Sequence, residues 1–351
     1  MGAGPAGSAA AIRLALAGTV PRLIDQQVIP GDALCGGFLS WATIAQLAEL
    51  GLTTDQLGGH RITQIALFAG EREERLALPA PGIGLSRHRL DSLLRTTAQS
   101  AGAQLLISRA TLLSPTDLTL DDGAAIPWDS LFLATGKHDL RGVGRPHGGD
   151  DPELGLRLKL DSHPSLHDLI GDRIELHMVD GGYVGLLLQE DGRANICMAV
   201  RKSRLAAAEG RPVALFHQLA DQSPALAARL ASLPADPRID AIGHVPYGWR
   251  ARNSWPGLYR LGDQAAVIPS LAGEGTGIAF ASAQRAVQRW QAEGREGAIV
   301  YQRDFARRAV LPLATAAAVR SLGSHPTLLR ALARAPGAAA LAMRLTRITP
   351  S

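Results

Sequence analysis

Apolar residues recur along the first third of the chain in two alternating patterns, at helical spacing and in short runs. This alternation predicts a helix that begins within residues 2–7 and ends near residue 17, followed by a buried strand over residues 20–25. Helices are also expected at residues 41–50 and 89–101. The strands expected in this region are 64–68, 75–78, 104–108 and 130–134, with a hairpin over 119–125 that turns at Asp122-Gly123.

Between residues 155 and 200 the apolar positions follow a period of two, which is typical of antiparallel strands. Helical spacing returns over 205–233, and residues 275–293 predict a long helix that Gly294 closes. The strands expected in this half are 156–160, 173–179, 183–189, 194–200, 239–247 and 258–261. Residues 298–347 predict further helices, interrupted at Pro312, Pro326 and Pro336.

This order of elements predicts an α/β protein built from interleaved segments. Alternating helices and strands, an antiparallel middle and a returning strand–helix unit indicate a discontinuous α/β domain with an antiparallel β-sheet domain inserted into it. The α/β domain is expected to comprise residues 1–60, 85–145 and 250–300. The inserted sheet domain would comprise residues 61–84 and 146–249, and residues 301–351 would form C-terminal helices.

Composition narrows the classes of protein to which the chain can belong. Of its 351 residues, 46% are hydrophobic and 19% are charged, which is typical of a folded globular protein. No apolar run approaches the roughly 18–20 residues that a membrane-spanning helix needs. The net charge of +4 comes mostly from scattered arginines without a basic stripe, which argues against nucleic-acid binding. Cys35 and Cys197 lie far apart and favour a reducing, cytoplasmic location, and the histidines show no metal-ligand spacing.

The first chemical motif is Gly-Ala-Gly-Pro-Ala-Gly at residues 2–7, which fits G-x-G-x-x-G at the start of a helix. Glycines there permit a tight turn, close approach of the backbone to a diphosphate, and close packing of the helix on a strand. The helix N-terminus adds free N–H groups and a partial positive charge. Asp25 ends the next strand, near the offset expected for an acid that binds the adenosine ribose and disfavours the 2′-phosphate of NADP. The candidate nucleotide ligands are Gly2, Gly4, Pro5, Ala6, Gly7 and Asp25.

This fingerprint normally follows a buried strand at the centre of the sheet, whereas only Met1 precedes Gly2 in this sequence. We therefore expect the codons upstream of Met1 to encode an apolar strand that ends in a small residue. The same observation also allows a separate interpretation, in which the chain is a truncated, non-catalytic flavin or nucleotide binder.

The second motif joins a strand to the long helix that begins near residue 275. Gly262-Asp263 ends the strand, and Gly-Glu-Gly-Thr-Gly at residues 273–277 opens the helix. Asp263 can accept a hydrogen bond from the ribitol chain of a flavin. The helix N-terminus, with Gly275, Thr276 and Gly277, can direct N–H groups at the pyrimidine edge of the isoalloxazine, where negative charge gathers on reduction.

Together with Ser-Arg-His-Arg-Leu-Asp at residues 86–91, the two motifs resemble those of FAD-dependent monooxygenases of the p-hydroxybenzoate hydroxylase type. They equally resemble those of the related geranylgeranyl reductase family. The resemblance covers most of residues 2–300 and implies FAD as the cofactor. It also implies an FAD/NAD(P)-binding Rossmann-like domain with an inserted antiparallel β-sheet substrate domain, and a place for Arg87 near the diphosphate or ribitol. Arginine suits that place because its planar fork matches phosphate oxygens.

Two further segments resemble parts of these families that face the substrate. Residues 30–37 resemble the loop that approaches the flavin in the reductase-like members, which makes Cys35 a candidate to line the substrate cavity; the alternative is a small buried apolar residue. Residues 181–186 resemble the sheet segment that faces the flavin, with Tyr183 as the candidate. Thr135 occupies the position at which many hydroxylases carry an acid that contacts both FAD and NAD(P)H. The sequence also lacks the Trp-x-Trp-x-Ile-Pro motif of flavin-dependent halogenases.

These observations predict an FAD-dependent oxidoreductase. The preferred interpretation is a monooxygenase that uses NAD(P)H transiently and hydroxylates a lipophilic or aromatic small molecule. The alternative is a flavoprotein that reduces carbon–carbon double bonds, as geranylgeranyl reductases do.

The C-terminal segment combines apolar residues with arginines at helical spacing. Residues 328–332 and 338–345 predict short basic amphipathic helices, which can make peripheral contact with a membrane interface. The alternative is that they cover the domain core. That alternative is favoured, because alanine-rich faces bury little area and neither Trp nor Phe follows Phe305. The arginines of this segment are Arg330, Arg334, Arg344 and Arg347.

Overall fold

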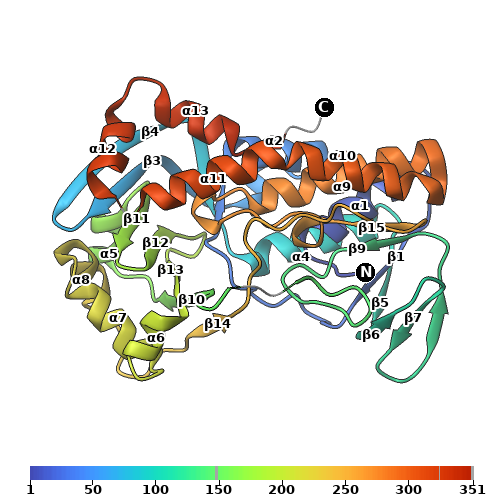
Figure 1. The fold of residues 1–351 in the computed structure, drawn as a ribbon, viewed down its shortest axis with the longest axis horizontal. Coiled ribbons are helices and arrows are strands. Elements are labelled where there is room, and N and C mark those ends of the chain that lie inside the picture. Colours follow the sequence, from blue (N-terminus) through green and yellow to red (C-terminus); the bar gives the residue numbers. More distant parts are fainter. Residues whose placement is uncertain (147–148, 324, 349–351) are drawn as a thin grey trace.

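The computed structural model describes residues 1–146, 149–323 and 325–348. Figure 1 shows two regions side by side, one around the N-terminus and the other built on a large sheet. The last helices of the chain extend across the top of both regions. The fold is α/β, with mixed and antiparallel sheets, and this agrees with the class that the sequence predicts.

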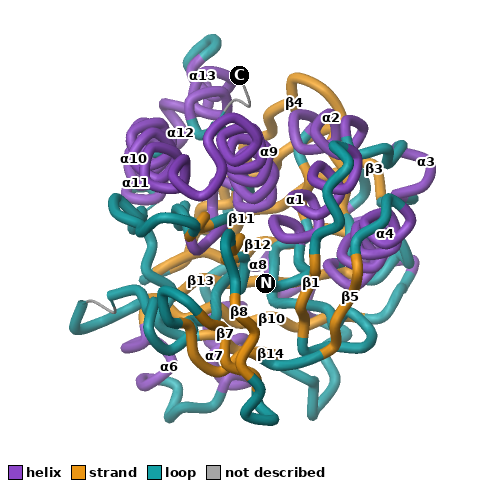
Figure 2. Tube along the Cα trace, turned by 90° about the vertical axis from the view of Figure 1, so that its right-hand side faces the viewer, coloured by secondary structure: helices purple, strands orange, loops and turns teal. Residues whose placement is uncertain are grey.

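The region around the N-terminus contains two pairs of parallel strands. Strand β1 (Arg22–Asp25) pairs with β5 (Gln104–Ile107), and β9 (Leu131–Leu133) pairs with β15 (Leu258–Arg260). Figure 2 shows β1 and β5 side by side below the helices. Each pair joins segments far apart in sequence, so the region forms only when distant parts of the chain meet.

The first residues of the chain lie between these two strand pairs. The amide of Gly2 donates to the carbonyl of Ile24 (2.7 Å), and the amide of Ala134 donates to the carbonyl of Met1 (2.9 Å). Helix α1 (Pro5–Leu16) starts directly afterwards. Its N-terminus is therefore fixed at the carboxyl ends of β1 and β9.

Three helices form most of the core of this region, namely α1, α4 (Arg87–Ser100) and α9 (Gly275–Glu293). Nine of the twelve residues of α1 are buried, and most of them are small. Small residues let α1 and α9 approach each other closely, and their alanines form a continuous part of the core. The core extends to α2 (Trp41–Glu49) and α10 (Gly297–Arg308).

The large sheet has eight strands in the order β14-β10-β13-β12-β11-β3-β4-β2. Strands β11 and β3 are parallel, with Arg173 opposite Gln64, whereas the other neighbouring strands are antiparallel. The expectation of a purely antiparallel sheet was wrong at this one pairing. No tight turn joins β3 to β11, and a long connection does not dictate an antiparallel direction. The bounds are β2 (Phe38–Leu39), β3 (His60–Ala69), β4 (Arg72–Gly84), β10 (Glu153–Leu160), β11 (Arg173–Val179), β12 (Gly182–Leu188), β13 (Ala194–Arg201) and β14 (Asp240–Ile242).

The two faces of this sheet have different environments. In β10, Leu156, Leu158 and Leu160 belong to a core covered by helices, whereas Arg157 and Lys159 point to the opposite face. The covering helices are α5 (Pro164–Ile170), α6 (Lys202–Ala207), α7 (Pro212–Ala220) and α8 (Pro224–Leu230). The opposite face turns toward the N-terminal region.

Most helices and strands lie where the apolar pattern places them, and the main differences concern lengths. Strands β3 and β4 extend well beyond 64–68 and 75–78, and β14 is much shorter than 239–247. Pro312 lies in the first turn of α11 (Val310–Leu322), where its missing N–H would lack a partner in any case. The predicted domain boundaries stay a prediction. The elements that the pattern did not predict are α3 (Thr54–Leu57), α5, β2 and β6 (Ala110–Leu113). Strand β6 forms a small sheet with β7 (Asp117–Leu120) and β8 (Ala125–Pro127), in which β7 lies in the middle.

The C-terminal helices α12 (Pro326–Arg334) and α13 (Ala338–Leu345) are tied to the rest of the chain by ion pairs. Arg330 and Arg334 both pair with Glu74 of β4, at 2.8 and 2.7 Å. Arg347 pairs with Glu274 at 2.8 Å. These contacts favour a covering role for the helices. Among the described residues, no helix is long and apolar enough to cross a membrane.

We expect the intact chain and an Arg330→Gln/Arg334→Gln double variant to be recovered equally poorly with anionic liposomes in flotation at low salt. The physical reason is that both guanidinium groups already pair with Glu74 and are not directed at lipid. Recovery of the intact chain that is lost in the double variant would instead assign these arginines to lipid binding.

Candidate cofactor and substrate site

A cavity of about 920 Å³ lies between the N-terminal region and the large sheet. This volume falls within the range of roughly 300–1,000 Å³ found for cofactor and small-molecule sites. Cys35 and Tyr183 line the cavity, as do residues of both chemical motifs. The predicted cofactor residues in its wall are Gly2, Gly4, Pro5, Ala6, Asp25, Arg87, Asp263, Gly275 and Thr276.

Two predicted cofactor residues, Gly7 and Gly277, are not in the cavity wall. A β-carbon at Gly7 would lie 1.8 Å from the carbonyl oxygen of Gly2, and one at Gly277 would lie 2.9 Å from Oε2 of Glu274. Glycine is therefore needed at position 7, where the neighbour is backbone, whereas at position 277 a β-carbon would displace the Glu274 carboxylate. Their place indicates that they shape the site from behind its surface.

The N-terminus of α1 forms one end of the cavity. Gly4 is its N-cap, and no side chain caps the first N–H groups of the helix. A β-carbon at Gly4 would have only the Arg87 guanidinium within 4 Å, at 3.3 Å, so the backbone is accessible from the cavity side. Free N–H groups, the helix dipole and a nearby guanidinium are the features that bind a diphosphate.

Asp25 is held in a fixed orientation at the end of β1. Its Oδ2 accepts the amide of Ala3 (2.7 Å), and its Oδ1 accepts the amide of Gln27 (2.9 Å). Arg95 lies 3.3 Å from the same Oδ1. Because each carboxylate oxygen has two lone pairs, the carboxylate can still accept hydroxyl groups from the cavity.

Arg87 is positioned by a bidentate ion pair with a residue of its own helix. Its Nε and Nη2 donate to Asp91, one turn later, at 2.9 and 2.8 Å. Burial disfavours the charged guanidinium, but the Asp91 carboxylate outweighs this effect and raises the pKa of Arg87 above its ordinary value. Arg87 therefore presents a permanent positive charge to the cavity beside the α1 N-terminus.

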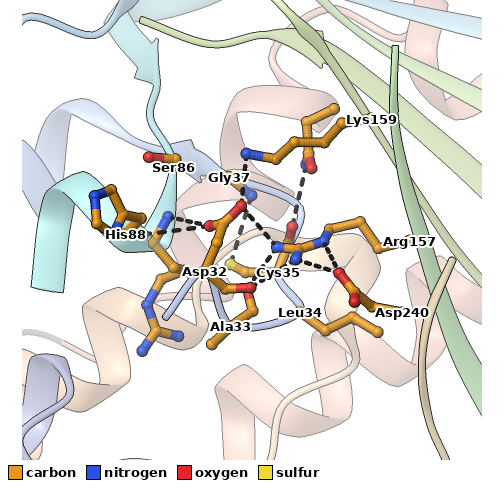
Figure 3. Close-up of polar contacts among 12 residues, drawn as sticks. Asp32, Ala33, Leu34, Cys35, Gly37, Ser86, His88, Arg157, Lys159 and Asp240 are labelled. Carbon is orange, nitrogen blue, oxygen red and sulfur yellow. Dashed lines mark hydrogen bonds and ion pairs between the residues drawn. The ribbon is translucent and has the colours of Figure 1, made fainter. Parts of the chain in front are cut away.

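The loop of residues 30–37 lines the cavity from residue 32 onward. Figure 3 shows the polar contacts that fix this part of the loop. Arg157 of β10 donates to the carbonyls of Asp32 (2.6 Å) and Ala33 (2.9 Å). Lys137 donates to the carbonyl of Leu34 (2.8 Å). These cations come from two different regions, so the loop joins the sheet to the N-terminal region.

The next two carbonyls of the same loop are bound from β13. Asn195 Nδ2 donates to the carbonyls of Cys35 (3.1 Å) and Gly36 (2.9 Å), and Cys197 Sγ donates to that of Cys35 (3.0 Å). Burial raises the pKa of Cys197 to about 12, so its thiol keeps the proton that it donates. Thus each of the five successive carbonyls from Asp32 to Gly36 accepts a hydrogen bond from a side chain of another segment. We call this set of contacts the loop clamp.

The carboxylate of Asp32 connects the loop clamp to α4. It accepts the amides of Arg87 (3.0 Å) and His88 (3.2 Å) at the helix N-terminus, and it pairs with Lys159 (2.5 Å) and Arg157 (3.2 Å). Burial favours the protonated acid, but the hydrogen bond from Lys159 and the two cations outweigh it and lower the pKa of Asp32. The sequence pattern did not predict this role of Asp32, Arg157 and Lys159. The available signal was a pair of cations alternating with three leucines along one strand.

The second motif forms the opposite wall of the cavity. The 3₁₀ helix η1 (Gly262–Gln264) carries Asp263, whose backbone carbonyl accepts Arg145 Nη1 at 2.9 Å. The N-terminus of α9 has no side-chain cap, and Gly275 and Thr276 face the cavity. Glu274 precedes them and is buried against Arg347. Burial raises the pKa of Glu274 despite this ion pair.

The face of the large sheet supplies the apolar wall of the cavity. Ile174 and Leu176 of β11 line it, as do Tyr183 and Leu187 of β12. Cys35 lies opposite on the loop, half-buried, and its sulfur accepts the amide of Gly37 at 3.5 Å. The structure thus brings both predicted substrate-cavity residues, Cys35 and Tyr183, to one cavity. Among the described residues, no group of three or more His, Cys, Asp or Glu side chains can hold a metal ion.

The residues of this cavity fit FAD. Two helix N-termini without side-chain caps face it, which suits the diphosphate at one and the electron-rich edge of a flavin ring at the other. Asp25 and Asp263 offer carboxylate oxygens to ribose and ribitol hydroxyls. The apolar wall between them suits an aromatic ring system.

Comparison with curated proteins gives relatives of one kind. A menaquinone reductase of Mycobacterium tuberculosis (strain H37Rv) is 30% identical over 301 residues, covering 78% of this chain and 71% of the relative. The menaquinone reductase of Mycolicibacterium smegmatis is 26% identical over 295 residues, again covering 78% and 71%. No family model matches the sequence.

Solved structures similar to this chain are flavin-dependent enzymes at low sequence identity. HpxO of Klebsiella pneumoniae, complexed with FAD and uric acid, has a TM-score of 0.74 at 16% identity, covering 99% of this chain and 96% of that one. PqsL of Pseudomonas aeruginosa, in complex with 2-aminobenzoylacetate, has a TM-score of 0.71 at 16% identity, covering 94% and 97%. The flavin-dependent brominase Bmp2 has a TM-score of 0.75 at 14% identity, covering 98% and 91%. These likenesses establish the fold.

Gly4→Val is expected to lower the affinity for FAD at least about tenfold, because a branched side chain would fill the space beside the first N–H groups of α1. Asp263→Ala should lower it as well, through loss of an acceptor for ribitol. Flavin content measured by absorption after dialysis checks both changes. Gly144→Val, at a position with open space around it, is the matched control. Unchanged flavin content in both variants would contradict the assignment of the two motifs.

Arg157→Met is expected to destabilise the fold by about 1–3 kcal/mol, because it leaves two backbone carbonyls without their donor and removes a cation that pairs with Asp32 and Asp240. The pKa of Asp32 is lowered in the folded chain, so its pairing stabilises the fold above the ordinary Asp pKa of 3.8 and is lost as the pH falls below it. The destabilisation measured by urea unfolding should therefore be largest near neutral pH and shrink in acid.

Arg193→Met serves as the control for this measurement. Arg193 is about half exposed and pairs with Asp191 at a hairpin turn, so a change of about 0–1 kcal/mol is expected. Equal destabilisation by the two substitutions would contradict the loop clamp, and a pH-independent effect of Arg157→Met would contradict the ion pair of Arg157 with Asp32.

Proposed function

This chain belongs to the family of FAD-dependent oxidoreductases that includes the mycobacterial menaquinone reductases, and from that membership we propose that it is a reductase. Its proposed substrate is a lipophilic quinone or polyprenyl compound, and the proposed reaction is the saturation of a carbon–carbon double bond. The observation that carries the proposal is the 30% identity to a menaquinone reductase across 78% of the chain.

The cavity supports a reaction of this kind. FAD, when bound, supplies two-electron transfer between a donor and a substrate. The α1 N-terminus and Arg87 would hold its diphosphate, Asp25 its ribose, Asp263 its ribitol, and the α9 N-terminus the pyrimidine edge of its ring. The apolar wall from β11 and β12 would exclude water and bind a lipophilic substrate.

We propose NAD(P)H as the electron donor, with its contacts supplied by residues other than an acid at position 135. Thr135 lines the cavity, but its hydroxyl donates to the carbonyl of His138 at 2.7 Å and so stabilises its own loop. A cytoplasmic location stays a prediction.

A monooxygenase is the second candidate function. It is favoured by the fold, since similar solved structures include PqsL, described as a probable FAD-dependent monooxygenase, and 2-methyl-3-hydroxypyridine-5-carboxylic acid oxygenase. Their identities of 16% and 18% are well below that of the menaquinone reductase. The reductase is therefore the first proposal.

Mass spectrometry of the product separates the two candidates. The FAD-loaded protein is supplied with NAD(P)H and menaquinone in detergent, with and without oxygen, and the quinone ring is then reoxidised in air. We expect a product that retains two additional hydrogens after reoxidation and that also forms without oxygen. Asp263→Ala, which should lose FAD, is expected to give no product. A product that gains one oxygen atom, formed only in air, would establish the monooxygenase instead.

A further inference from the structure

Three hydroxyl groups from distant segments meet in the wall of the cavity. Tyr183 lies near the start of β12, Tyr247 follows β14, and Ser270 opens the 3₁₀ helix η2 (Ser270–Ala272). Tyr183 Oη donates to Ser270 Oγ at 2.8 Å, and Tyr247 Oη donates to the same oxygen at 3.1 Å. All three residues line the cavity. We call these residues the hydroxyl cluster.

The hydrogen-bond inventory of the hydroxyl cluster leaves one donor unused. A serine hydroxyl has two lone pairs and one hydrogen. The two tyrosines occupy both lone pairs of Ser270 Oγ, and Ser270 donates to no residue in the part of the chain that the structure describes. Its hydrogen is therefore available to the cavity, toward which Ser270 is exposed.

The two tyrosines remain donors to Ser270, and their hydrogen bonds make the Ser270 hydroxyl a stronger donor. Burial raises the pKa of Tyr247 to about 12 and that of Tyr183 well above its ordinary value, so both remain protonated donors at neutral pH. A hydroxyl that accepts hydrogen bonds becomes a better donor itself, because the bonds polarise one another.

The surroundings favour a neutral acceptor over an anion. Val245, Val267, Ile268 and Leu271 line the cavity in the same chain segments as Tyr247 and Ser270. The guanidinium of Arg320 lies over the Tyr247 ring, 5.9 Å from its centroid, but it is paired with Glu153 at 3.1 Å. The cluster is thus one strong hydrogen-bond donor in an apolar wall.

We propose that the hydroxyl cluster binds a neutral carbonyl oxygen of an otherwise apolar substrate, through a hydrogen bond donated by Ser270. A quinone ring carries an oxygen of this kind. The inference deepens the proposed function and rests on it for the class of substrate, since it names the group by which the cavity recognises a quinone.

Paired probes isolate the contact in the oxidised, FAD-loaded protein. One probe is 2,3-dimethyl-1,4-naphthoquinone, whose blocked ring positions prevent addition of thiols, and the other is 2,3-dimethylnaphthalene, which lacks the oxygens. Binding is followed by calorimetry and by perturbation of the flavin absorption spectrum, without an electron donor, so that no turnover occurs.

Ser270→Ala is expected to weaken binding of the naphthoquinone about three- to tenfold, the loss of one neutral hydrogen bond, and to leave the hydrocarbon unaffected. Ser270→Thr should restore naphthoquinone binding because it keeps the hydroxyl. Val267→Ala, which only removes apolar contact, should weaken both probes alike. An unchanged flavin spectrum and thermal unfolding midpoint establish that each variant is folded.

Three results would overturn the proposal. The first is equal naphthoquinone binding by the unmodified protein and Ser270→Ala, and the second is an equal loss of affinity for both probes in Ser270→Ala. The third is a loss that appears only when Tyr183→Phe and Tyr247→Phe are added to Ser270→Ala, which would place the contact on the tyrosines. The two proposals fail separately. Double-bond reduction with no effect of Ser270→Ala on binding overturns only this inference, and a hydroxylated product together with selective naphthoquinone binding overturns only the proposed function.

Discussion

The loop clamp is the interaction on which the site depends. A loop that crosses a cavity carries backbone carbonyls that cost free energy when they are buried without a donor. Here the donors are Arg157, Lys137, Asn195 and Cys197, which come from the sheet and from the N-terminal region. The bonds that satisfy the loop therefore also fix the distance between the sheet and the cofactor end of the cavity. Asp32 extends this linkage to α4 and hence to Arg87.

The face of the sheet that turns away from the cavity is fixed by buried charges as well as by apolar contacts. Glu175 of β11 is fully buried and pairs with Arg229 of α8 at 2.8 Å, and the ring of His177 stacks on Phe68 at 4.3 Å. Ile174 and Leu176, which alternate with Glu175 and His177 along β11, line the cavity. Because neighbouring residues of a strand point to opposite faces, packing against α8 sets the orientation of the cavity wall.

The features that the sequence predicts well are those determined within a single segment of the chain. The bounds of α9 and β11, the glycine fingerprint and the Asp25 offset follow from period, caps and spacing within one segment. The loop clamp, the pair of Glu274 with Arg347 and the parallel pairing of β11 with β3 could not be predicted, because each joins residues more than 70 positions apart. The hydroxyl cluster was predicted only at Tyr183, since nothing local to Tyr247 or Ser270 marks a shared site.

The pairing of β9 with β15 and the position of α9 have a consequence for synthesis of the protein. The glycine fingerprint leaves the ribosome more than 200 residues before Asp263 and the α9 N-terminus. At roughly 5–20 residues per second, the nascent chain carries half of a cofactor site for a period on the order of ten seconds to a minute. During that time Arg157 and Lys159 have been made, whereas one wall of the cavity has not. The cavity is therefore complete, and able to hold a ligand between both of its walls, only in the last part of translation or in the released chain.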